Sequence, residues 1–186
     1  GMSTSARLEL LRTFRAAALF CTPTYALHLA DQAKRDGLDP SSLGVRKIVV
    51  AGEPGGSVLD VRDRIEREWR AQVIDHAGAS EVGAWGFADP LRRGVFVNEA
   101  EFIPEFLQPG SDLIAEPGET AELVLTSLGR TGAPVIRYRT GDLVRPIRNP
   151  DGPCGFTLLA GGVLGRVDDM LIVRGVNIFP SSVEAI

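Results

Sequence analysis

The sequence predicts an α/β fold in which a parallel sheet with helices is followed by a β-rich lobe. Up to residue 84, short apolar runs rich in β-branched residues alternate with segments whose apolar residues recur at helical spacing. From about residue 85 onward, the helical spacing disappears and short apolar runs are separated by Gly, Pro and Asp clusters. We therefore divide the chain into an α/β part (1–84), a β-rich lobe (85–164) and a charged last segment (165–186).

The α/β part alternates helices and strands in a regular order. Apolar spacing predicts helices over residues 5–14, 24–36 and 57–69, and apolar runs predict strands over residues 16–21, 47–51 and 71–75. Strands separated by helices pair in parallel through right-handed crossovers. Ligands of such sheets bind beyond the carboxyl ends of the strands, which here lie at residues 22–23, 52–54 and 75–83.

The second half carries only strand patterns. We expect strands over residues 95–102, 121–126, 135–138, 143–147, 156–159 and 170–173, joined by hairpins. The last of them lies in the segment GRVDDMLIVRGVNIFP (165–180), where Arg166 and two aspartates directly precede an apolar run. Charges beside a buried strand are costly unless they meet ligands or each other, so this segment is predicted to be a site or a hinge.

Composition excludes several classes of function. The net charge of −4, with acids and bases interspersed, gives no basic stripe for nucleic acid. No apolar run approaches the roughly 20 residues of a membrane span. Cys21 and Cys154 are far apart and are expected to be free thiols in the cytoplasm. With only His28 and His76 besides, we expect no structural zinc site.

The segment DHAGASEVG (75–83) brings a hydroxyl and a carboxylate together after a predicted strand. A sharp turn there can direct Ser80 and Glu81 at one spot, where the hydroxyl donates to a phosphate oxygen and the carboxylate holds Mg²⁺. Taken alone, however, the pattern is better explained as a polar turn whose serine caps a helix.

Two further motifs each allow a ligand-binding and a structural explanation. In RYRTGDL (137–143), Asp142 follows a strand and can accept two hydrogen bonds from a vicinal diol such as that of ribose, although a plain β-turn would have the same residues. Arg166 and Asp168 can likewise form a surface ion pair worth well under about 1 kcal/mol.

The segment SLGRTGAP (127–134) has the superficial look of a phosphate-binding loop, but we predict only a turn between strands. It lacks the density of Ser, Thr and Gly that lets backbone N–H groups surround a phosphate. No helix is predicted after it to add a dipole.

In this order, the motifs resemble the adenylate-forming acyl-CoA ligases, in particular the phenylacetate–CoA ligase branch and its relatives that adenylate a deazaflavin coenzyme. The resemblance rests on AGEP (51–54), the DxxGxSE turn (75–81), LVLTSLGRTGAPVIRYRTGDL (123–143) and GGVLGRVDDMLIVRGVNIFPSSVE (161–184), and so covers nearly the whole chain. It implies the second half of the large N-terminal adenylation domain, followed by a hinge and the start of a C-terminal domain at residues 165–186.

The resemblance also implies roles for individual residues. Ser80 would contact the α-phosphate of ATP and Glu81 would hold Mg²⁺, Asp168 would be the hinge, and Gly175 would lie near coenzyme A. The implied nucleotide site consists of Gly52, Glu53, Pro54, Asp75, His76, Ala77, Gly78, Asp142 and Arg166. The family joins a carboxylic acid, here expected to be aromatic or similar, to AMP and then transfers it to coenzyme A.

Some features depart from the family pattern. Ala77 stands where relatives often carry a tyrosine that packs on adenine, and Cys154 lacks the other cysteines of a turn found in the branch. The phosphate loop is expected upstream of residue 1 and the C-terminal lysine beyond Ile186, while Lys34 and Lys47 lie in no matching context. Gly1 before Met2 has the look of a tag remnant, and residues 181–186 that of a helix cut short.

Three hypotheses follow from these departures. The chain is a piece of an AMP-forming ligase that is inactive alone, or a natural short relative that binds nucleotide or a partner protein. In the third, it is a degenerate relic that pairs with itself as a homodimer through core surface normally covered by the missing half.

Overall fold

The computed structural model describes residues 1–148, 155–169, 171–173 and 176–178. The chain divides into two compact units, Gly1–His76 and Ala77–Ile186. The boundary between the units falls within strand β3 (Gln72–Ala79), whose last residues belong to the second unit. The predicted limits at residues 84 and 164 concern domains of the whole protein and stay predictions.

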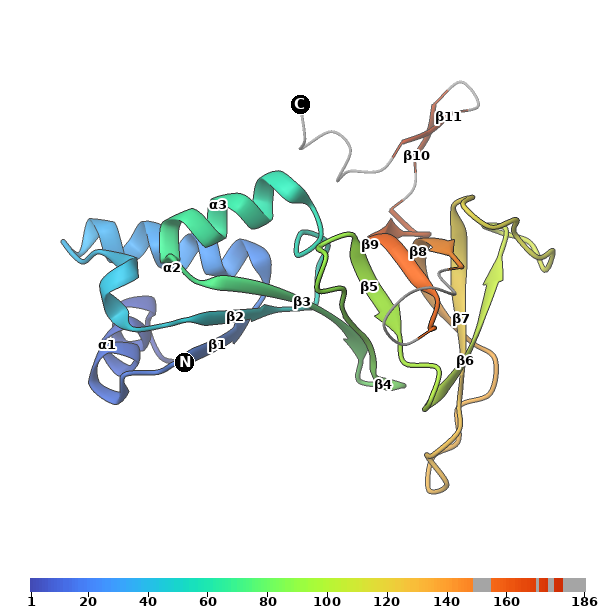
Figure 1. Cartoon of the computed structure of the whole chain (residues 1–186), viewed down its shortest axis with the longest axis horizontal. Coiled ribbons are helices and arrows are strands. Elements are labelled where there is room, and N and C mark those ends of the chain that lie inside the picture. Colours follow the sequence, from blue (N-terminus) through green and yellow to red (C-terminus); the bar gives the residue numbers. More distant parts are fainter. Residues whose placement is uncertain (149–154, 170, 174–175, 179–186) are drawn as a thin grey trace. The chain divides into compact units, whose positions relative to one another are not determined.

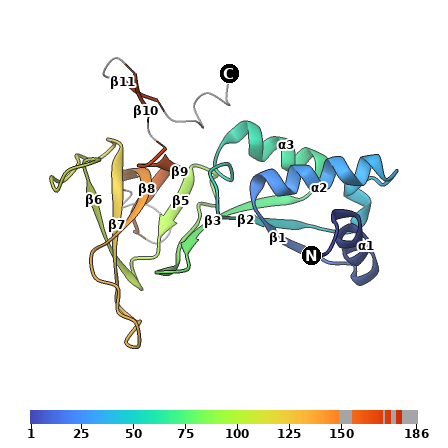
Figure 2. The same ribbon diagram turned by 180° about the vertical axis from the view of Figure 1, so that it is seen from behind.

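The first unit is a parallel sheet with helices, as predicted (Figure 1). Its elements are α1 (Thr4–Phe14), β1 (Ala18–Cys21), α2 (Pro23–Arg35), a 3₁₀ turn (Pro40–Leu43), β2 (Lys47–Val50), α3 (Leu59–Trp69) and β3 (Gln72–Ala79). The strands pair in parallel in the order β1-β2-β3. Helices α2 and α3 lie side by side along the sheet (Figure 2).

Local sequence explains where these helices begin. The Thr22 hydroxyl accepts a hydrogen bond from the Tyr25 N–H at the start of α2, and Pro23 occupies a first-turn position that needs no N–H donor. Packing then fixes the helices, because Trp69 of α3 is fully buried and its indole N–H donates to the Ala26 carbonyl of α2 at 3.0 Å. Around this contact lies a core that includes Leu8, Leu29, Ile48, Ile65 and Val73.

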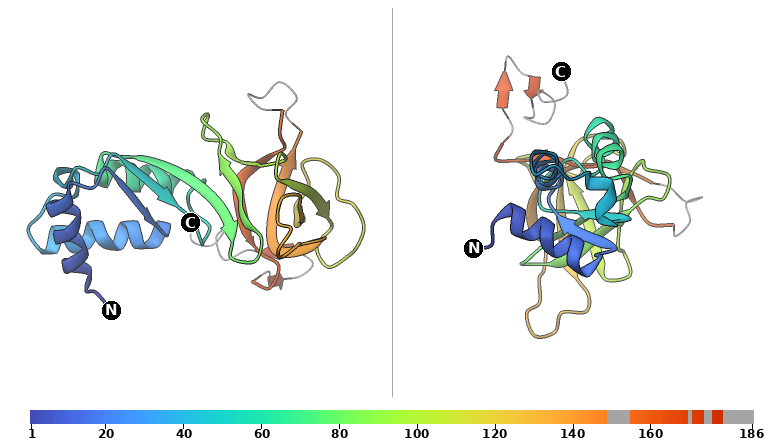
Figure 3. Two further views of the ribbon diagram at one scale, coloured as in Figure 1. Left: turned by 90° about the horizontal axis from the view of Figure 1, so that it is seen from below. Right: turned by 90° about the vertical axis from the view of Figure 1, so that its left-hand side faces the viewer.

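The second unit is β-rich, as predicted. Its strands are the end of β3, β4 (Gly83–Ala88), β5 (Gly94–Val97), β6 (Phe102–Leu107), β7 (Ala121–Ser127), β8 (Tyr138–Ile147) and β9 (Leu158–Arg166), followed by a separate antiparallel pair, β10 (Leu171–Val173) and β11 (Val176–Ile178). The order in the sheet is β3-β4-β5-β9-β8-β7-β6. The loop between β7 and β8, drawn in gold, projects beyond the strands (Figure 3).

Several strand boundaries were predicted wrongly. The run 95–102 is two strands, because a turn at residues 98–101, closed by the Glu101 N–H on the Asn98 carbonyl at 3.0 Å, separates β5 from β6. The predicted strand 143–147 is the second half of β8, which begins at Tyr138 and continues through residues 139–142 with a register shift against β7. Residues 135–137 lie before this strand. Strand β3 extends to Ala79, beyond the predicted end at residue 75, because it forms a hairpin with β4. No strand was predicted at the position of β4.

No helix within the described residues is both long and apolar enough to cross a membrane.

The pairing of β5 with β9 depends on Gly94, whose φ is +155° and whose register partner is Ala160. A β-carbon at this position would lie inside van der Waals distance of the Leu159 carbonyl oxygen. We expect Gly94→Ala to lower the free energy of unfolding by about 3 kcal/mol or more, measured by urea unfolding.

Gly110→Ala is the matched control, because Gly110 also has a positive φ (+76°) but has no atom within 4 Å of an added β-carbon. It should lose only the conformational term of about 1 kcal/mol. Equal losses in the two variants would contradict the steric explanation.

Candidate functional site

Asp142 and Arg166, both predicted to bind nucleotide, face each other across β8 and β9 and are register partners. The Arg166 Nη1 donates to Asp142 Oδ1 at 3.0 Å and to the Thr140 carbonyl at 2.8 Å. Thr140, which was not among the predicted site residues, is buried and holds the segment from inside. Its hydroxyl donates to the Leu123 carbonyl and accepts from the Asp142 N–H. The position of Thr140 in the Thr-Gly-Asp motif (140–142) is the sequence feature from which this structural role could have been predicted.

The guanidinium lies directly over Gly141. A β-carbon there would come within 2.7 Å of Arg166 Nη2, and the glycine φ is +74°, so a side chain at position 141 would strain the backbone and displace the guanidinium. The Thr-Gly-Asp segment is therefore an irregular part of a strand shaped around Arg166, and the alternative of a plain β-turn is wrong.

The Asp142 carboxylate is largely enclosed, with 16% of its side chain exposed. Burial raises the pKa of Asp142 above the ordinary aspartate value, while the hydrogen bond from Arg166 partly opposes that shift. Asp168 lies 3.7 Å from Arg166 Nη2 but is 74% exposed, so this second contact is a weak surface pair. Arg166 thus connects two predicted site residues, and its strong partner is Asp142.

Ser80 and Glu81 form the exposed turn between β3 and β4. The alternative in which the serine caps a helix is wrong, because a strand follows. Ala77 and Val82 flank the turn and are buried in the same cluster as Val144 of β8. The turn and the Asp142 strand therefore share one core.

The Glu81 carboxylate has no hydrogen bond or ion pair within the described part of the chain, and no group of three or more His, Cys, Asp or Glu side chains gathers there for a metal. Mg²⁺ is usually held by one or two carboxylates together with substrate phosphates and water. A single exposed carboxylate beside a serine hydroxyl fits that mode of binding.

The 127–134 segment connects β7 to β8 and is followed by a strand, as predicted. Its Arg130 reaches the turn, where Nη1 donates to the Glu81 carbonyl. No pattern in the sequence predicts this role for Arg130, because Arg130 and Glu81 are far apart along the chain.

Gly52, Glu53 and Pro54 lie in the loop that follows β2 in the first unit. The Glu53 carboxylate accepts from the Thr24 N–H at 2.6 Å, at the start of α2. Further along the same loop, the Ser57 hydroxyl donates to Asp75 Oδ2, and Gly56 packs against the other oxygen of that carboxylate. Two predicted nucleotide-binding carboxylates thus also fix the loop.

The remaining predicted residues lie on β3 or outside the described residues. His76 is half-buried, Ala77 is buried against Gly86, and Gly78 is exposed. Gly175, predicted to lie near coenzyme A, and Cys154 fall outside the described residues. Burial raises the pKa of the Cys21 thiol to about 11, which keeps it protonated at neutral pH.

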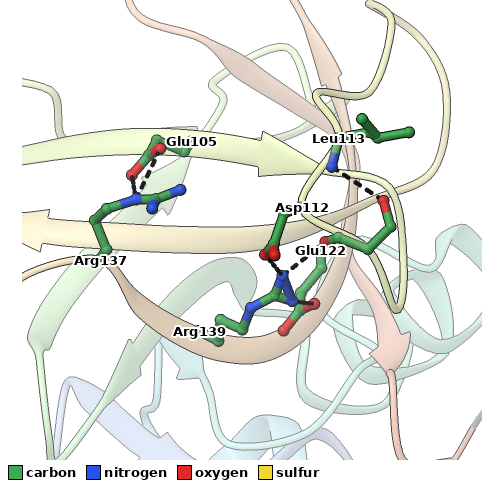
Figure 4. Close-up of polar contacts among 7 residues, drawn as sticks. Glu105, Asp112, Leu113, Glu122, Arg137 and Arg139 are labelled. Atoms are coloured by element: carbon green, nitrogen blue, oxygen red, sulfur yellow. Dashed lines mark hydrogen bonds and ion pairs between the residues drawn. The ribbon is translucent and has the colours of Figure 1, made fainter.

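Two arginines of the RYRTGDL motif form ion pairs within the β-rich unit instead of lining a site (Figure 4). Arg137 donates to the Glu105 carboxylate at 3.0 and 3.2 Å. Arg139 donates to the buried Glu122 at 2.8 Å and to Asp112 at 2.9 Å. They join β8 to β6, to β7 and to the loop after β6, and so fix the strand that carries Asp142.

No protein-family model matches the chain. Individual curated proteins match nearly the whole chain. The chain is 36% identical over 187 residues to a phenylacetate–coenzyme A ligase of Pseudomonas putida, covering 99% of this chain and 42% of that protein. It is also 36% identical over 188 residues to the phenylacetate–coenzyme A ligase of Escherichia coli K12, again covering 99% of this chain and 42% of the relative.

Solved structures agree with these matches. A 2-hydroxyisobutyryl-CoA ligase in the postadenylation state, in complex with R3-HIB-AMP, superposes with a TM-score of 0.90 at 33% identity, over 98% of this chain and 39% of that one. The same ligase in an open conformation with 2-HIB-AMP and CoA gives 0.84, over 98% of this chain and 43% of that one. Apo MatB from Rhodopseudomonas palustris, at 17% identity and a TM-score of 0.63, shows the fold alone.

Fold and sequence together place the chain among the adenylate-forming ligases. More particularly, it is a homologue of the phenylacetate–coenzyme A ligases and of 2-hydroxyisobutyryl-CoA ligase. It spans about 42% of the length of the curated relatives it matches.

The Ser57–Asp75 contact gives a pH-dependent prediction. Burial raises the pKa of Asp75, and the Ser57 hydroxyl opposes that shift, so Ser57→Ala should raise the pKa further. The variant should be less stable by about 1–3 kcal/mol at neutral pH, where the carboxylate is ionised. Because the folded-state pKa of Asp75 is higher in the variant than in the unaltered protein, this loss should shrink as the pH falls through the raised pKa.

Urea unfolding over a pH series measures the effect. Asp75→Asn supplies the control background, since an amide oxygen still accepts from Ser57 but does not titrate. A loss from Ser57→Ala that is the same at every pH would contradict the assignment to Asp75.

Proposed function

We propose that residues 1–186 form the part of an AMP-forming acyl-CoA ligase that binds the AMP moiety and Mg²⁺. The substrate is a carboxylic acid of aromatic or similar kind, which is joined to AMP and then passed to coenzyme A. The observation that carries the proposal is the Asp142 carboxylate, enclosed and oriented by Arg166, in a chain homologous to ligases solved with acyl-AMP.

Asp142 binds the ribose hydroxyls in this proposal. A carboxylate accepts hydrogen bonds from both hydroxyls of a vicinal diol, and a carboxylate already oriented by an arginine loses little freedom on binding. Gly52, Glu53, Pro54 and residues 75–78 make the adenine contacts. With Ala77 on β3, adenine packs there against a methyl group instead of a ring.

In this proposal, the turn after β3 binds the α-phosphate of the nucleotide. The Ser80 hydroxyl donates to the α-phosphate, and the Glu81 carboxylate holds Mg²⁺, which would neutralise charge on the phosphate oxygens. Asp168 is the point about which a C-terminal domain turns, and Gly175 lies near the thiol arm of coenzyme A. The chemistry is mainly positioning and charge stabilisation.

The first test is AMP binding by calorimetry. Asp142→Asn should lower the AMP affinity roughly 10–100-fold, because charge-assisted hydrogen bonds to ribose are lost. Asp169→Asn, which alters an exposed aspartate two residues after Val167, is the control and should leave the affinity unchanged. Equal AMP affinities in the two variants would remove Asp142 from the site.

The same titration has a signed pH dependence. Because burial raises the pKa of Asp142, AMP affinity should begin to fall on acidification at a higher pH than an ordinary aspartate would give. Arg166→Gln removes the opposing hydrogen bond and should move the fall to still higher pH.

We further propose that the 186-residue polypeptide binds nucleotide without turning over. Loss of one electrostatic donor typically lowers the rate by about 10²–10³, and the resemblance assigns both a phosphate loop and a lysine to residues other than these 186. ATP–pyrophosphate exchange with a set of aryl acids should therefore stay at background, with a phenylacetate–CoA ligase as positive control. Exchange clearly above background would refute this part of the proposal.

A further inference from the structure

The loop between β7 and β8 (residues 128–137) has no role in the function proposed above. Its Arg130 nevertheless contacts the turn that carries Ser80 and Glu81, by donating from Nη1 to the Glu81 carbonyl. Both residues belong to the second unit. The contact places a guanidinium at the backbone of the turn.

The base of this loop is held in place by backbone hydrogen bonds. The Leu128 N–H donates to the Glu101 carbonyl at 2.9 Å, and the Ser127 N–H donates to the Val135 carbonyl at 2.9 Å. Arg130 therefore extends from a closed hairpin whose two sides are paired, which restricts where its side chain can reach.

Arg130 differs from four other arginines of the second unit in the kind of group that it contacts. Residues 77–186 contain no lysine, so the cationic side chains that they can offer a phosphate are arginines. Four of these pair with carboxylates, in the combinations Arg93–Asp89, Arg137–Glu105, Arg139–Glu122 and Arg166–Asp142. The partner of Arg130 is a neutral carbonyl, so its positive charge stays available.

We propose that Arg130 binds the phosphate of the nucleotide at the Ser80–Glu81 turn. A guanidinium carries several N–H donors in a planar fork that matches phosphate oxygens, and one of its nitrogens is already fixed by the carbonyl. Because Arg130 donates to the carbonyl of Glu81, the carboxylate of the same residue stays available for Mg²⁺. This assignment rests on the proposed function and deepens it.

Comparing two ligands tests the assignment, because adenosine has the base and ribose of AMP but no phosphate. Calorimetry of the full chain should show AMP affinity about tenfold lower in Arg130→Gln, as expected for the loss of a charge-assisted hydrogen bond. Adenosine affinity should not change. Arg130→Lys, which keeps the charge, should recover part of the AMP affinity, and Arg145→Gln removes an exposed arginine of β8 as the matched control.

Each other outcome overturns the assignment in a recognisable way. If Arg130→Gln binds AMP as the unaltered chain does, Arg130 does not bind phosphate. If it weakens AMP and adenosine equally, Arg130 only supports the turn. If the unaltered chain binds neither ligand, the proposed function itself fails, and the assignment that rests on it fails too.

Discussion

The contact between Arg166 and Asp142 is the interaction on which the arrangement of the β-rich unit's candidate site depends. An enclosed carboxylate is unfavourable unless a charge or hydrogen-bond donor compensates for its lost hydration. Arg166 supplies both, and its second bond, to the Thr140 carbonyl, holds the backbone on either side of Gly141. Glycine at position 141 leaves room for this guanidinium, because a β-carbon there would lie 2.7 Å from Arg166 Nη2.

The first unit uses the same principle at a different place. Side-chain carboxylates bind backbone N–H groups or hydroxyls, and so fix loops that regular secondary structure leaves open. Glu53 holds its loop to the start of α2, and Asp75 holds the end of the loop through Ser57. Such loops lose little entropy when a ligand binds, which favours affinity.

Arginine does most of this work in the second unit, where lysine is absent. Arg139 joins three segments through one guanidinium, which a single ammonium could not orient in the same plane. Arg130 differs because its anchor is a carbonyl, and this difference is what makes it a candidate for binding an anion. The role of each arginine follows from its partner.

The sequence by itself determined the α/β class, the three parallel strands with their helices, the β-rich second unit and the family, because apolar periodicity and contiguous motifs are local properties. Only the tertiary structure decided that β8 runs unbroken through Thr-Gly-Asp, that Asp75 bonds to Ser57, and that Arg130 meets Glu81. These features depend on contacts between residues far apart in the chain. Periodicity carries no information about such contacts, so the sequence named Asp142 and Arg166 but not the partners that hold them in place.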